Sequence, residues 1–351
     1  MGSRSGSLEC MGFSKGGREI NMAFWSGRRV FVTGASGLVG SYLVEELVRQ
    51  GAFIVCLVKD WNPQSELIRS GQINQVYVVQ GRLEDYQVVE EAINEYEIDT
   101  VFHLGAQTIV QTALRAPLYT FESNIRGTYN LLEACRRHRN LVHRILIASS
   151  DKAYGSSEVL PYVESMPLQG RHPYDVSKSC TDLIAQCFAT SYKMPIVISR
   201  CGNIYGGGDL NWNRLIPGVI KSLLEDSSPV IRSNGQFTRD YVYVKDVVDA
   251  YLALMEHSDR CNLFGEAYNF GPNRPYTVLE VVKEIQVLME KEDIQINIED
   301  TAQGEIKDQS LSSVKITGKI GWQPRYSLEL GLNETITWYR EFLRQSQTVI
   351  L

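Results

Sequence analysis

The stretch RVFVTGASGLVG at residues 29–40 decides the fold. It opens with an apolar, β-branched run at 30–32, which is typical of a buried strand. Gly34, Gly37 and Gly40 follow, and the apolar residues after them repeat at helical spacing. Glycines between a strand and a helix let the backbone approach a phosphate, and the helix N-terminus supplies amide donors. The stretch therefore predicts a dinucleotide-binding βα unit.

The remainder of the first 200 residues repeats this alternation. Further apolar runs of strand length lie at 53–58, 76–79, 100–104, 145–148 and 196–199, and helical patterns include 88–96 and 124–138. Strands that alternate with helices predict an α/β fold, a Rossmann-type doubly wound parallel sheet. After residue 200 the alternation breaks down, which predicts a smaller C-terminal lobe. There, Thr277 and Glu280 have capping-box spacing before a helix to about 291, and a last helix is expected at about 328–343.

Composition excludes several classes of protein. The 351 residues carry 35 Lys+Arg against 41 Asp+Glu, a net charge of −6, with 44% hydrophobic residues. This describes an ordinary globular chain and argues against a nucleic-acid binder. The seven cysteines include no CxxC pair, and the five histidines show no zinc-ligand spacing. No apolar run is long enough to span a membrane. We expect a cytoplasmic protein with no metal and no membrane contact.

The second strand ends without the usual acid. Val58 stands where an acid that binds the adenosine ribose is expected, followed by Lys59 and Asp60. Asp60 could bind the ribose and Lys59 a 2′-phosphate, or both could be solvated loop charges. NAD is the predicted cofactor, and NADP stays open.

A tyrosine and a lysine lie four residues apart at the start of a predicted helix. Tyr174 and Lys178 therefore share one helix face. A phenol has a pKa of about 10 in water, and a nearby ammonium and an oxidised nicotinamide lower it. The pair predicts a base for a sugar hydroxyl, whereas alone it could be a surface pair.

The triplet Ser150-Asp151-Lys152 follows the fifth strand. The carboxyl ends of parallel strands are where such sheets bind ligands. Ser150 is expected to share a substrate hydroxyl with Tyr174, while Asp151 and Lys152 add a proton donor and a possible base. The alternative is an ordinary turn with a salt bridge.

Together with TGASGLVG (33–40), SSDKAYG (149–155) and YDVSK (174–178), five more segments complete a pattern. They are HLGAQ (103–107), NIRGTYNLLEA (124–134), RCGNIYGGGD (200–209), RDYVYVKDVVDAY (239–251) and NFGP (269–272). The chain resembles the extended short-chain dehydrogenase/reductases, specifically the nucleotide-sugar 4,6-dehydratases, from about residue 24 to 343. The Asp-Lys pair of the triplet is similar to that of CDP-glucose 4,6-dehydratases, while HLGAQ and the end of the second strand resemble GDP-mannose 4,6-dehydratases. Arg82 stands where the family often has an adenine-contacting Asp.

The resemblance implies a set of site residues. The catalytic group is Ser150, Asp151, Lys152, Tyr174 and Lys178. The cofactor is expected on Gly34, Ser36, Gly37, Leu38, Val39, Gly40, Lys59, Asp60, Leu83, Leu104 and Ala106, besides Tyr174 and Lys178. The nucleotide-diphosphate sugar is expected on Gln107, Thr108, Asn124, Asn203, Arg214, Arg232 and Arg239, although each arginine alone could be a surface residue and Gln107 and Thr108 could be loop packing.

The implied reaction converts an NDP-hexose, CDP-glucose before GDP-mannose, to its 4-keto-6-deoxy form. Tyr174 would remove the O4 proton, Asp151 would protonate the leaving C6 oxygen, and Lys152 would be the base at C5 or a structural ammonium. The alternatives are a nucleotide-sugar epimerase or decarboxylase on the same fold, and a non-catalytic dinucleotide-binding sensor.

The expected organisation has three parts. These are a flexible tail over 1–26, a dinucleotide-binding domain over 27–200 with 236–259 folding back onto it, and a nucleotide-sugar lobe from 201–235 and 260–345. The tail could be a tag remnant or a targeting segment. Apolar faces on the helices at 126–138 and 175–190 predict a homodimer, and a tetramer stays open.

Overall fold

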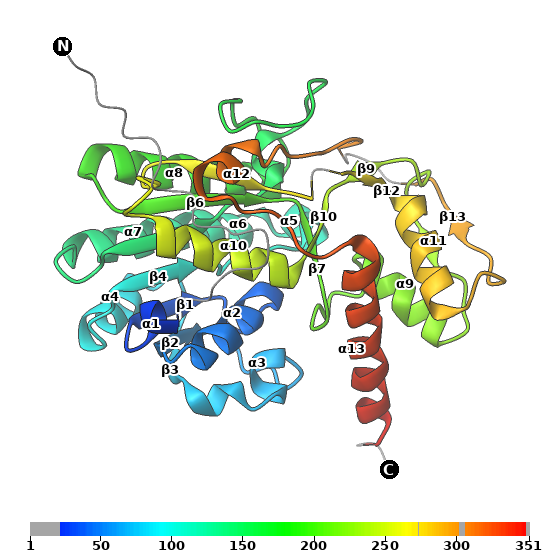
Figure 1. Cartoon of the computed structure of the whole chain (residues 1–351), viewed down its shortest axis with the longest axis horizontal. Coiled ribbons are helices and arrows are strands. Elements are labelled where there is room, and N and C mark those ends of the chain that lie inside the picture. Colours follow the sequence, from blue (N-terminus) through cyan, green and yellow to red (C-terminus); the bar gives the residue numbers. More distant parts are fainter. Residues whose placement is uncertain (1–21, 273, 302–305, 349–351) are drawn as a thin grey trace.

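The computed structural model describes residues 22–272, 274–301 and 306–348, and a seven-stranded parallel sheet forms its centre (Figure 1). The sheet order is β11-β6-β5-β4-β1-β2-β3. Its strands are β1 Arg29–Thr33, β2 Phe53–Val58, β3 Tyr77–Gln80, β4 Thr100–His103, β5 Arg144–Ala148, β6 Ile196–Cys201 and β11 Ala267–Phe270. The predicted Rossmann-type sheet is confirmed. The seventh strand, β11, was not predicted, because it lies inside loop-rich sequence and the polar Asn269 interrupts its apolar run.

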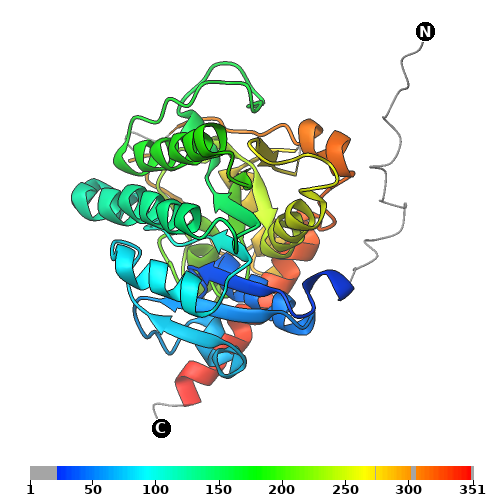
Figure 2. The same cartoon turned by 90° about the vertical axis from the view of Figure 1, so that its left-hand side faces the viewer.

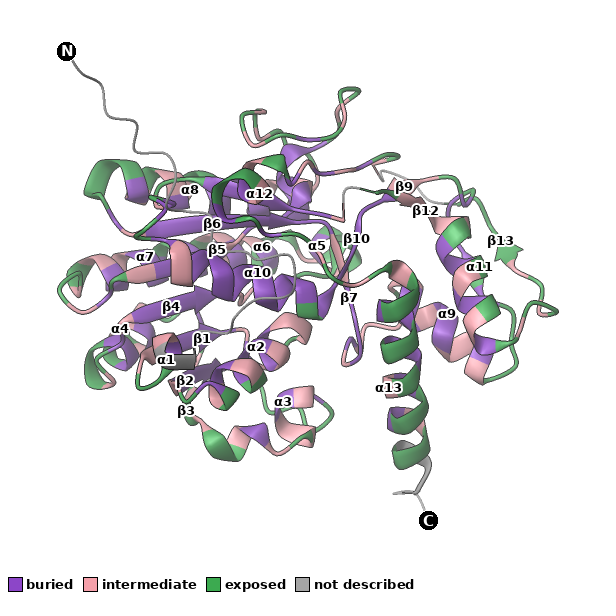
Figure 3. Ribbon diagram, viewed as in Figure 1, coloured by how far each residue is buried: buried purple, intermediate pink, exposed green. Residues whose placement is uncertain are grey.

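Helices cover both faces of the sheet, and the central strands are buried on both (Figures 2 and 3). On one face lie α2 Leu38–Arg49, α10 Val244–His257 and α12 Val314–Ile320; on the other lie α4 Tyr86–Glu95, α7 Gly127–Arg137 and α8 Pro173–Tyr192. Strand β1 shows why two cores form. Val30 and Val32 pack with the first set of helices and Phe31 with the second, because successive side chains point to opposite faces.

The second lobe has its own apolar core. Helices α9 Leu215–Leu224, α11 Val278–Met289 and α13 Leu328–Thr348 pack around Ile220, Leu223, Ile285 and Leu332. This second half of the chain also forms three two-stranded sheets: β7 Asn203–Tyr205 with β10 Tyr241–Tyr243, β8 Val230–Ile231 with β13 Asn297–Ile298, and β9 Thr238–Arg239 with β12 Tyr276–Thr277.

The ends of three predicted helices differ from expectation. Thr277 and Glu280 form the predicted capping box, and α11 ends two residues before the expected 291. Helix α13 continues past the expected 343 to Thr348. The helix expected from 124 begins as α7 at Gly127, after a π-helical turn at Glu122–Arg126.

The chain start also differs from expectation. Most of the expected flexible tail lies outside the described residues. Within them, Met22–Trp25 forms the helical turn α1, and Trp25 is fully buried with its indole Nε1 donating to Glu256 at 2.6 Å.

The remaining short helices lie in connections: α3 Glu66–Arg69, α5 Val110–Arg115, α6 Pro117–Phe121, and 3₁₀ turns at Gln72–Gln75 and Asp151–Tyr154. Among the described ranges, no helix is both long and apolar enough to cross a membrane, and no group of His, Cys, Asp and Glu is arranged to hold a metal ion.

Gly40 in α2 provides a test of how tightly the first βα turn is packed. A Cβ at this position would overlap the Gly34 carbonyl oxygen and lie 2.7 Å from the Ala35 Cα. Because these are backbone atoms, Gly40→Ala is expected to lower the free energy of unfolding in urea by about 1–3 kcal/mol. Gly318→Ala is the matched control, since its Cβ meets nothing within 4 Å in α12 and should stabilise by about 0.5–1 kcal/mol. Equal stability of the two variants would contradict the packing argument.

Candidate active site

The glycine loop forms a backbone cradle at the N-terminus of α2. Gly34 has a φ of +75°, and a Cβ there would lie 2.7 Å from the Gly105 nitrogen, so the loops after β1 and β4 touch. Gly37 caps α2, and its N–H donates to the Gly34 carbonyl at 3.0 Å. The cradle therefore has the bare backbone and helix N-terminus that a pyrophosphate requires.

A buried histidine fastens the floor of this cradle. His103 Nδ1 lies 2.8 Å from the Thr33 hydroxyl, and Nε2 lies 3.0 Å from the Thr128 hydroxyl. Thr128 donates its own hydrogen to the Asn124 carbonyl at 2.6 Å, so it accepts from Nε2, and Nε2 carries the proton. Burial, with the charge of Lys178 nearby, lowers the His103 pKa to about 3, so the ring stays neutral. His103 was not predicted as a site residue, although it opens the HLGAQ motif.

The Ser150-Asp151-Lys152 triplet forms a tight turn at the end of β5. Ser150 is the N-cap of the 3₁₀ turn, accepting from the Lys152 N–H at 3.2 Å and donating to Asp151 Oδ1 at 2.9 Å. Asp151 is buried. Tyr174 lies in the first turn of α8 and hydrogen-bonds Ser150. Serine, carboxyl group and phenol are therefore brought together as the sequence predicts.

The electrostatic state of Tyr174 differs from expectation. Burial raises its pKa to about 12, and the charge of Asp151 adds to this effect. The influences that oppose this rise are the charge of Arg214 and the hydrogen bond between Tyr174 and Ser150, rather than Lys178. For the chain by itself the pKa of Tyr174 is raised rather than lowered, because the loss of hydration of the phenolate outweighs the nearby positive charge; the lowering expected beside an oxidised nicotinamide stays a prediction.

Lys178 is buried beneath the site, where its charged form is unfavourable. Its Nζ donates to the Ala148 carbonyl at 2.8 Å, and burial lowers its pKa to about 8. The charge of Asp182 opposes that lowering, but Asp182 is already paired with Arg200 at 2.8 Å.

The loop after β4 is tied to α8 by one amide side chain. Asn124, in the π-helical turn, accepts from the Gln107 N–H at 2.7 Å and donates to the Gln107 carbonyl at 3.0 Å and to the Ser177 hydroxyl at 2.9 Å. The Gln107 side chain bonds within its own loop, to Thr120 at 3.0 Å and to the backbone of Ile109. These bonds favour the loop-packing interpretation of Gln107.

The predicted arginines occupy three different environments. Arg214 precedes α9 and bonds Asp209 at 2.8 Å and the Thr108 hydroxyl at 3.1 Å. Arg239 is buried and donates to backbone carbonyls, among them those of Ile306 and Lys307 at 2.5 and 2.6 Å. Arg232 is exposed and bonds Asn213, while Asn203 is half-buried in β7. The structure therefore brings Arg214 toward Tyr174, and it does not bring Arg232 into contact with the catalytic group.

The expected adenosine end lies past β2. Lys59 donates to the Tyr119 hydroxyl at 2.6 Å and lies 3.5 Å from Asp60, whose side chain is 73% exposed. Leu83 packs against the backbone at Gly105 and Gly127, where a Cβ would come within 2.8 and 2.7 Å of it. Tyr119 was missed by the sequence analysis because no local pattern places it beside Lys59.

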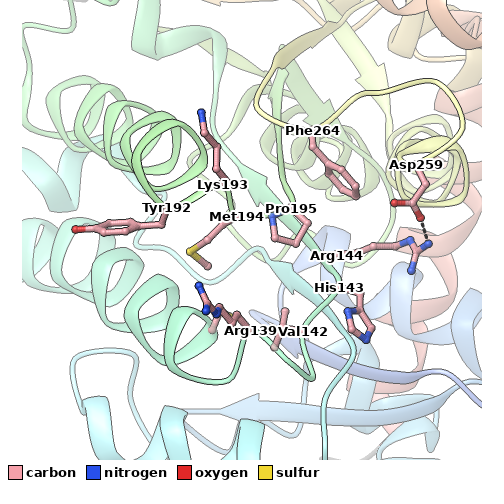
Figure 4. A pocket seen from close by; sticks show the side chains of 11 residues that line it. Arg139, Val142, His143, Arg144, Tyr192, Lys193, Met194, Pro195, Asp259 and Phe264 are labelled. Atoms are coloured by element: carbon pink, nitrogen blue, oxygen red, sulfur yellow. Dashed lines mark hydrogen bonds and ion pairs between the residues drawn. The ribbon is translucent and has the colours of Figure 1, made fainter.

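A separate cavity of about 660 Å³ lies at the opposite, amino edge of the sheet (Figure 4). Its lining includes His143 just before β5, Arg144 at the first position of β5, and Lys193 and Met194 before β6, and Arg144 is paired with Asp259 (Figure 4). None of the predicted site residues lines it.

The site combines a glycine cradle at the end of β1, a serine at the end of β5, and a buried Tyr-x-x-x-Lys pair at the start of α8, and this combination defines a class of enzyme. These features identify a dinucleotide-dependent enzyme of the extended short-chain dehydrogenase/reductase type.

The chain belongs to the GDP-mannose 4,6 dehydratase family, whose model matches residues 31–335. It is 29% identical to CDP-glucose 4,6-dehydratase of Salmonella typhimurium, over 94% of this chain and 96% of that protein. Among solved structures it is similar to dTDP-glucose 4,6-dehydratase of Bacillus anthracis in complex with NAD, with 26% identity, a TM-score of 0.80 and coverage of 90% and 97%. It is also similar to UDP-glucose 4-epimerase of Thermotoga maritima with UDP-glucose, with 27% identity, a TM-score of 0.82 and coverage of 90% and 99%.

The burial of the Lys178 ammonium predicts that this residue, which is kept for the function of the site, lowers the free energy of unfolding. Below about pH 8 the fold holds a disfavoured ammonium, and this cost disappears as pH rises toward the ordinary lysine value of 10.5. At pH 7, Lys178→Met is expected to raise the free energy of unfolding by about 1–2 kcal/mol, after the lost Ala148 bond is counted. The gain, followed by urea unfolding, should shrink above pH 8. Lys283→Met, at an exposed position on α11, should change stability at no pH, and a destabilised Lys178→Met would contradict the argument.

Proposed function

We propose that the protein is an NAD-dependent nucleotide-sugar 4,6-dehydratase that converts an NDP-hexose to the NDP-4-keto-6-deoxyhexose. CDP-glucose is the favoured substrate and GDP-mannose the next. The observation that carries the proposal is the turn after β5, where Asp151 and Lys152 lie beside the Ser150 and Tyr174 pair. An oxidoreductase that acts only at C4 needs the serine and the tyrosine; elimination of water also needs an acid and a base.

The residues present fit a dinucleotide. The cradle at Gly34, Gly37 and Gly40 accepts a pyrophosphate, because side chains at Gly34 and Gly40 would collide with backbone. Lys59 and Asp60, which follow β2, are proposed to bind the adenosine ribose, and Leu83, Leu104 and Ala106 are proposed to line the path from there to Tyr174 and Lys178. When bound, NAD supplies a hydride acceptor at C4 of the sugar, a hydride donor at C6, and a positive charge beside the phenol.

The chain's own residues handle the protons. Tyr174 takes the O4 proton, and the charge of Arg214 and the hydrogen bond between Tyr174 and Ser150 oppose the rise of its pKa. Asp151 gives a proton to the C6 oxygen, and Lys152 takes the C5 proton. Arg214 and Arg239 are proposed to bind the diphosphate, with Asn203 beside them, while Asn124 positions α8.

The relatives support the sugar-nucleotide assignment. The Salmonella relative named above is a CDP-glucose 4,6-dehydratase and covers nearly the whole chain. The similarity to a UDP-glucose 4-epimerase supports a second candidate, an epimerase on the same fold. The acid and base in the turn favour the dehydratase, since inversion at C4 involves no loss of water.

Assembly as a homodimer is proposed through the outer helices. Leu114 on α5, Tyr129 on α7 and Leu183 on α8 expose 54%, 42% and 53% of their surface. Apolar side chains on helices packed side by side are typical of a symmetric interface. A cytoplasmic location is also proposed, supported by the free thiols of all six described cysteines.

The test of activity uses CDP-glucose, GDP-mannose, dTDP-glucose and UDP-glucose in separate incubations. The expected result is a product of CDP-glucose that has lost one water by mass and absorbs in alkali as a 4-ketone. Tyr174→Phe should reduce kcat at least about 100-fold, because it removes the O4 base. Tyr192→Phe, at an exposed position on the same helix, is the control and should be fully active. Inversion without loss of water would establish the epimerase, and full activity of Tyr174→Phe would support a non-catalytic role for the site.

The test of assembly is sedimentation of wild type against Leu183→Glu. A buried carboxylate at an apolar interface is strongly unfavourable, so the variant should sediment as a monomer where wild type is a dimer. Leu330→Glu, at an equally exposed position on α13, should leave the dimer intact. A monomeric wild type would overturn the proposal, and a tetramer would require a second interface.

A further inference from the structure

One segment of the second lobe runs back toward the central sheet and passes beside the Ser150-Asp151-Lys152 turn. Residues 306–313 lie between β13 and α12, in orange in Figure 1. On one side, Thr238 N–H donates to Lys307 and Gln309 N–H donates to Thr238, both at 3.1 Å. On the other side, Tyr162 N–H donates to Ser310 at 2.7 Å, and Ser312 N–H donates to Tyr162 at 2.9 Å. The backbone of the 306–313 segment is therefore held from both sides.

The same segment is anchored by a buried carboxyl group. The Leu311 N–H donates to Asp240 Oδ2 at 2.5 Å. The Ser313 hydroxyl donates to the Gly271 carbonyl at 3.0 Å. These bonds leave little freedom for the residues between Lys307 and Ser313.

Gln309 connects this segment to the triplet. Its side chain is only 1% exposed, and its Oε1 accepts from the Lys152 ammonium. The amide also interacts with the Tyr162 hydroxyl, an interaction that opposes the rise of that phenol's pKa. Tyr162 donates its own hydrogen to the Gly155 carbonyl at 2.6 Å.

The contact with Lys152 fixes the orientation of the amide. Its Oε1 faces Lys152 as the acceptor of the ammonium hydrogen bond, so its Nε2 points the other way. Within the described residues this Nε2 is buried and has no hydrogen-bond partner. The Tyr162 ring stacks on the ring of Tyr154, with 4.8 Å between the two centroids, and this contact holds Tyr162 in place.

We propose that Gln309 is a positioning residue for the elimination step, holding Lys152 Nζ in place to take the C5 proton; this rests on the proposed dehydratase function. In that step the C5–H bond breaks and its proton moves to the neutral amine of Lys152. The electron pair forms the C5–C6 double bond as the C6–O bond breaks, and Asp151 supplies the proton that leaves with the oxygen as water. An N–H of the amine donates to Gln309 throughout, so the lone pair points away from the amide and toward the sugar.

Several charged or titratable groups of the described residues face this region. They are Asp151 in the turn, Asp175 and His172 at the start of α8, Tyr162, Arg239 on β9 and Asp240 beyond it. These residues are the same in wild type and in every Gln309 variant, so the variants differ in sequence only at position 309.

The experiment measures kcat and KM against pH for the full chain with the sugar nucleotide that wild type dehydrates. Gln309→Glu places a carboxylate on the ammonium, so the acid limb of the kcat profile should move about 1–3 pH units higher. Gln309→Leu should lower kcat about 10-fold to 100-fold with KM nearly unchanged, because Gln309 does not touch the sugar. Gln323→Leu and Gln323→Glu, at an exposed position, are the matched controls and should match wild type.

A double-mutant cycle separates positioning from packing. In a Lys152→Met background, Gln309→Leu should cost no further activity, because the amide acts through the ammonium. An additive loss, or an unmoved acid limb in Gln309→Glu, would overturn the inference. Failure of wild type to release water from any of the four sugar nucleotides would instead overturn the proposed function, so the two failures are distinct.

Discussion

A continuous chain of buried hydrogen bonds joins the glycine loop to the tyrosine of the site. It starts at the Thr33 hydroxyl, passes through the ring of His103 to Thr128, and reaches the backbone of Asn124. The Asn124 amide then donates to the Ser177 hydroxyl, which donates to the Tyr174 carbonyl at 2.7 Å. Each polar group in this dry region needs its neighbour, because an unpaired one would cost about 1–3 kcal/mol. The position of the nucleotide cradle and that of the phenol are therefore set by one network.

Burial also determines which groups of the site are charged. His103 is kept neutral, and Tyr174 and Lys178 are both pushed toward their neutral forms by burial. A phenol and an amine that are both reluctant to ionise respond strongly to any charge brought near them, since little water is present to screen it. The Asp182–Arg200 pair holds α8 to β6, and the charge of Asp182 partly opposes the lowering of the Lys178 pKa.

How much could be predicted from the sequence depended on whether the physical cause was local. The cradle around Gly34, the turn at Ser150 and the Tyr174 pair each lie within one strand-loop-helix unit, and periodicity and turn chemistry indicate such units directly. Strand β11 was not predicted because the polar Asn269 interrupts its apolar run and loop-rich sequence surrounds it. The raised pKa of Tyr174 also could not be predicted, because burial depends on segments distant in the chain. Gln309 lies 157 residues from Lys152, and nothing in its neighbours marks it.

The division of labour between the two halves of the chain follows from these distances. The sheet supplies what every member of this class needs: a cradle, a tyrosine and a lysine on rigid elements. In the proposed site, the second lobe supplies what distinguishes one reaction from another, because the 306–313 segment carries Gln309 to Lys152 and also accepts the hydrogen bonds of Arg239. If Arg239 binds the diphosphate and Lys152 acts at C5 as proposed, a displacement of this segment acts on both ends of a bound sugar nucleotide together. Two proteins with the same sheet can then differ in chemistry through one returning segment, which explains why similarity of fold to both a dehydratase and an epimerase does not decide between them.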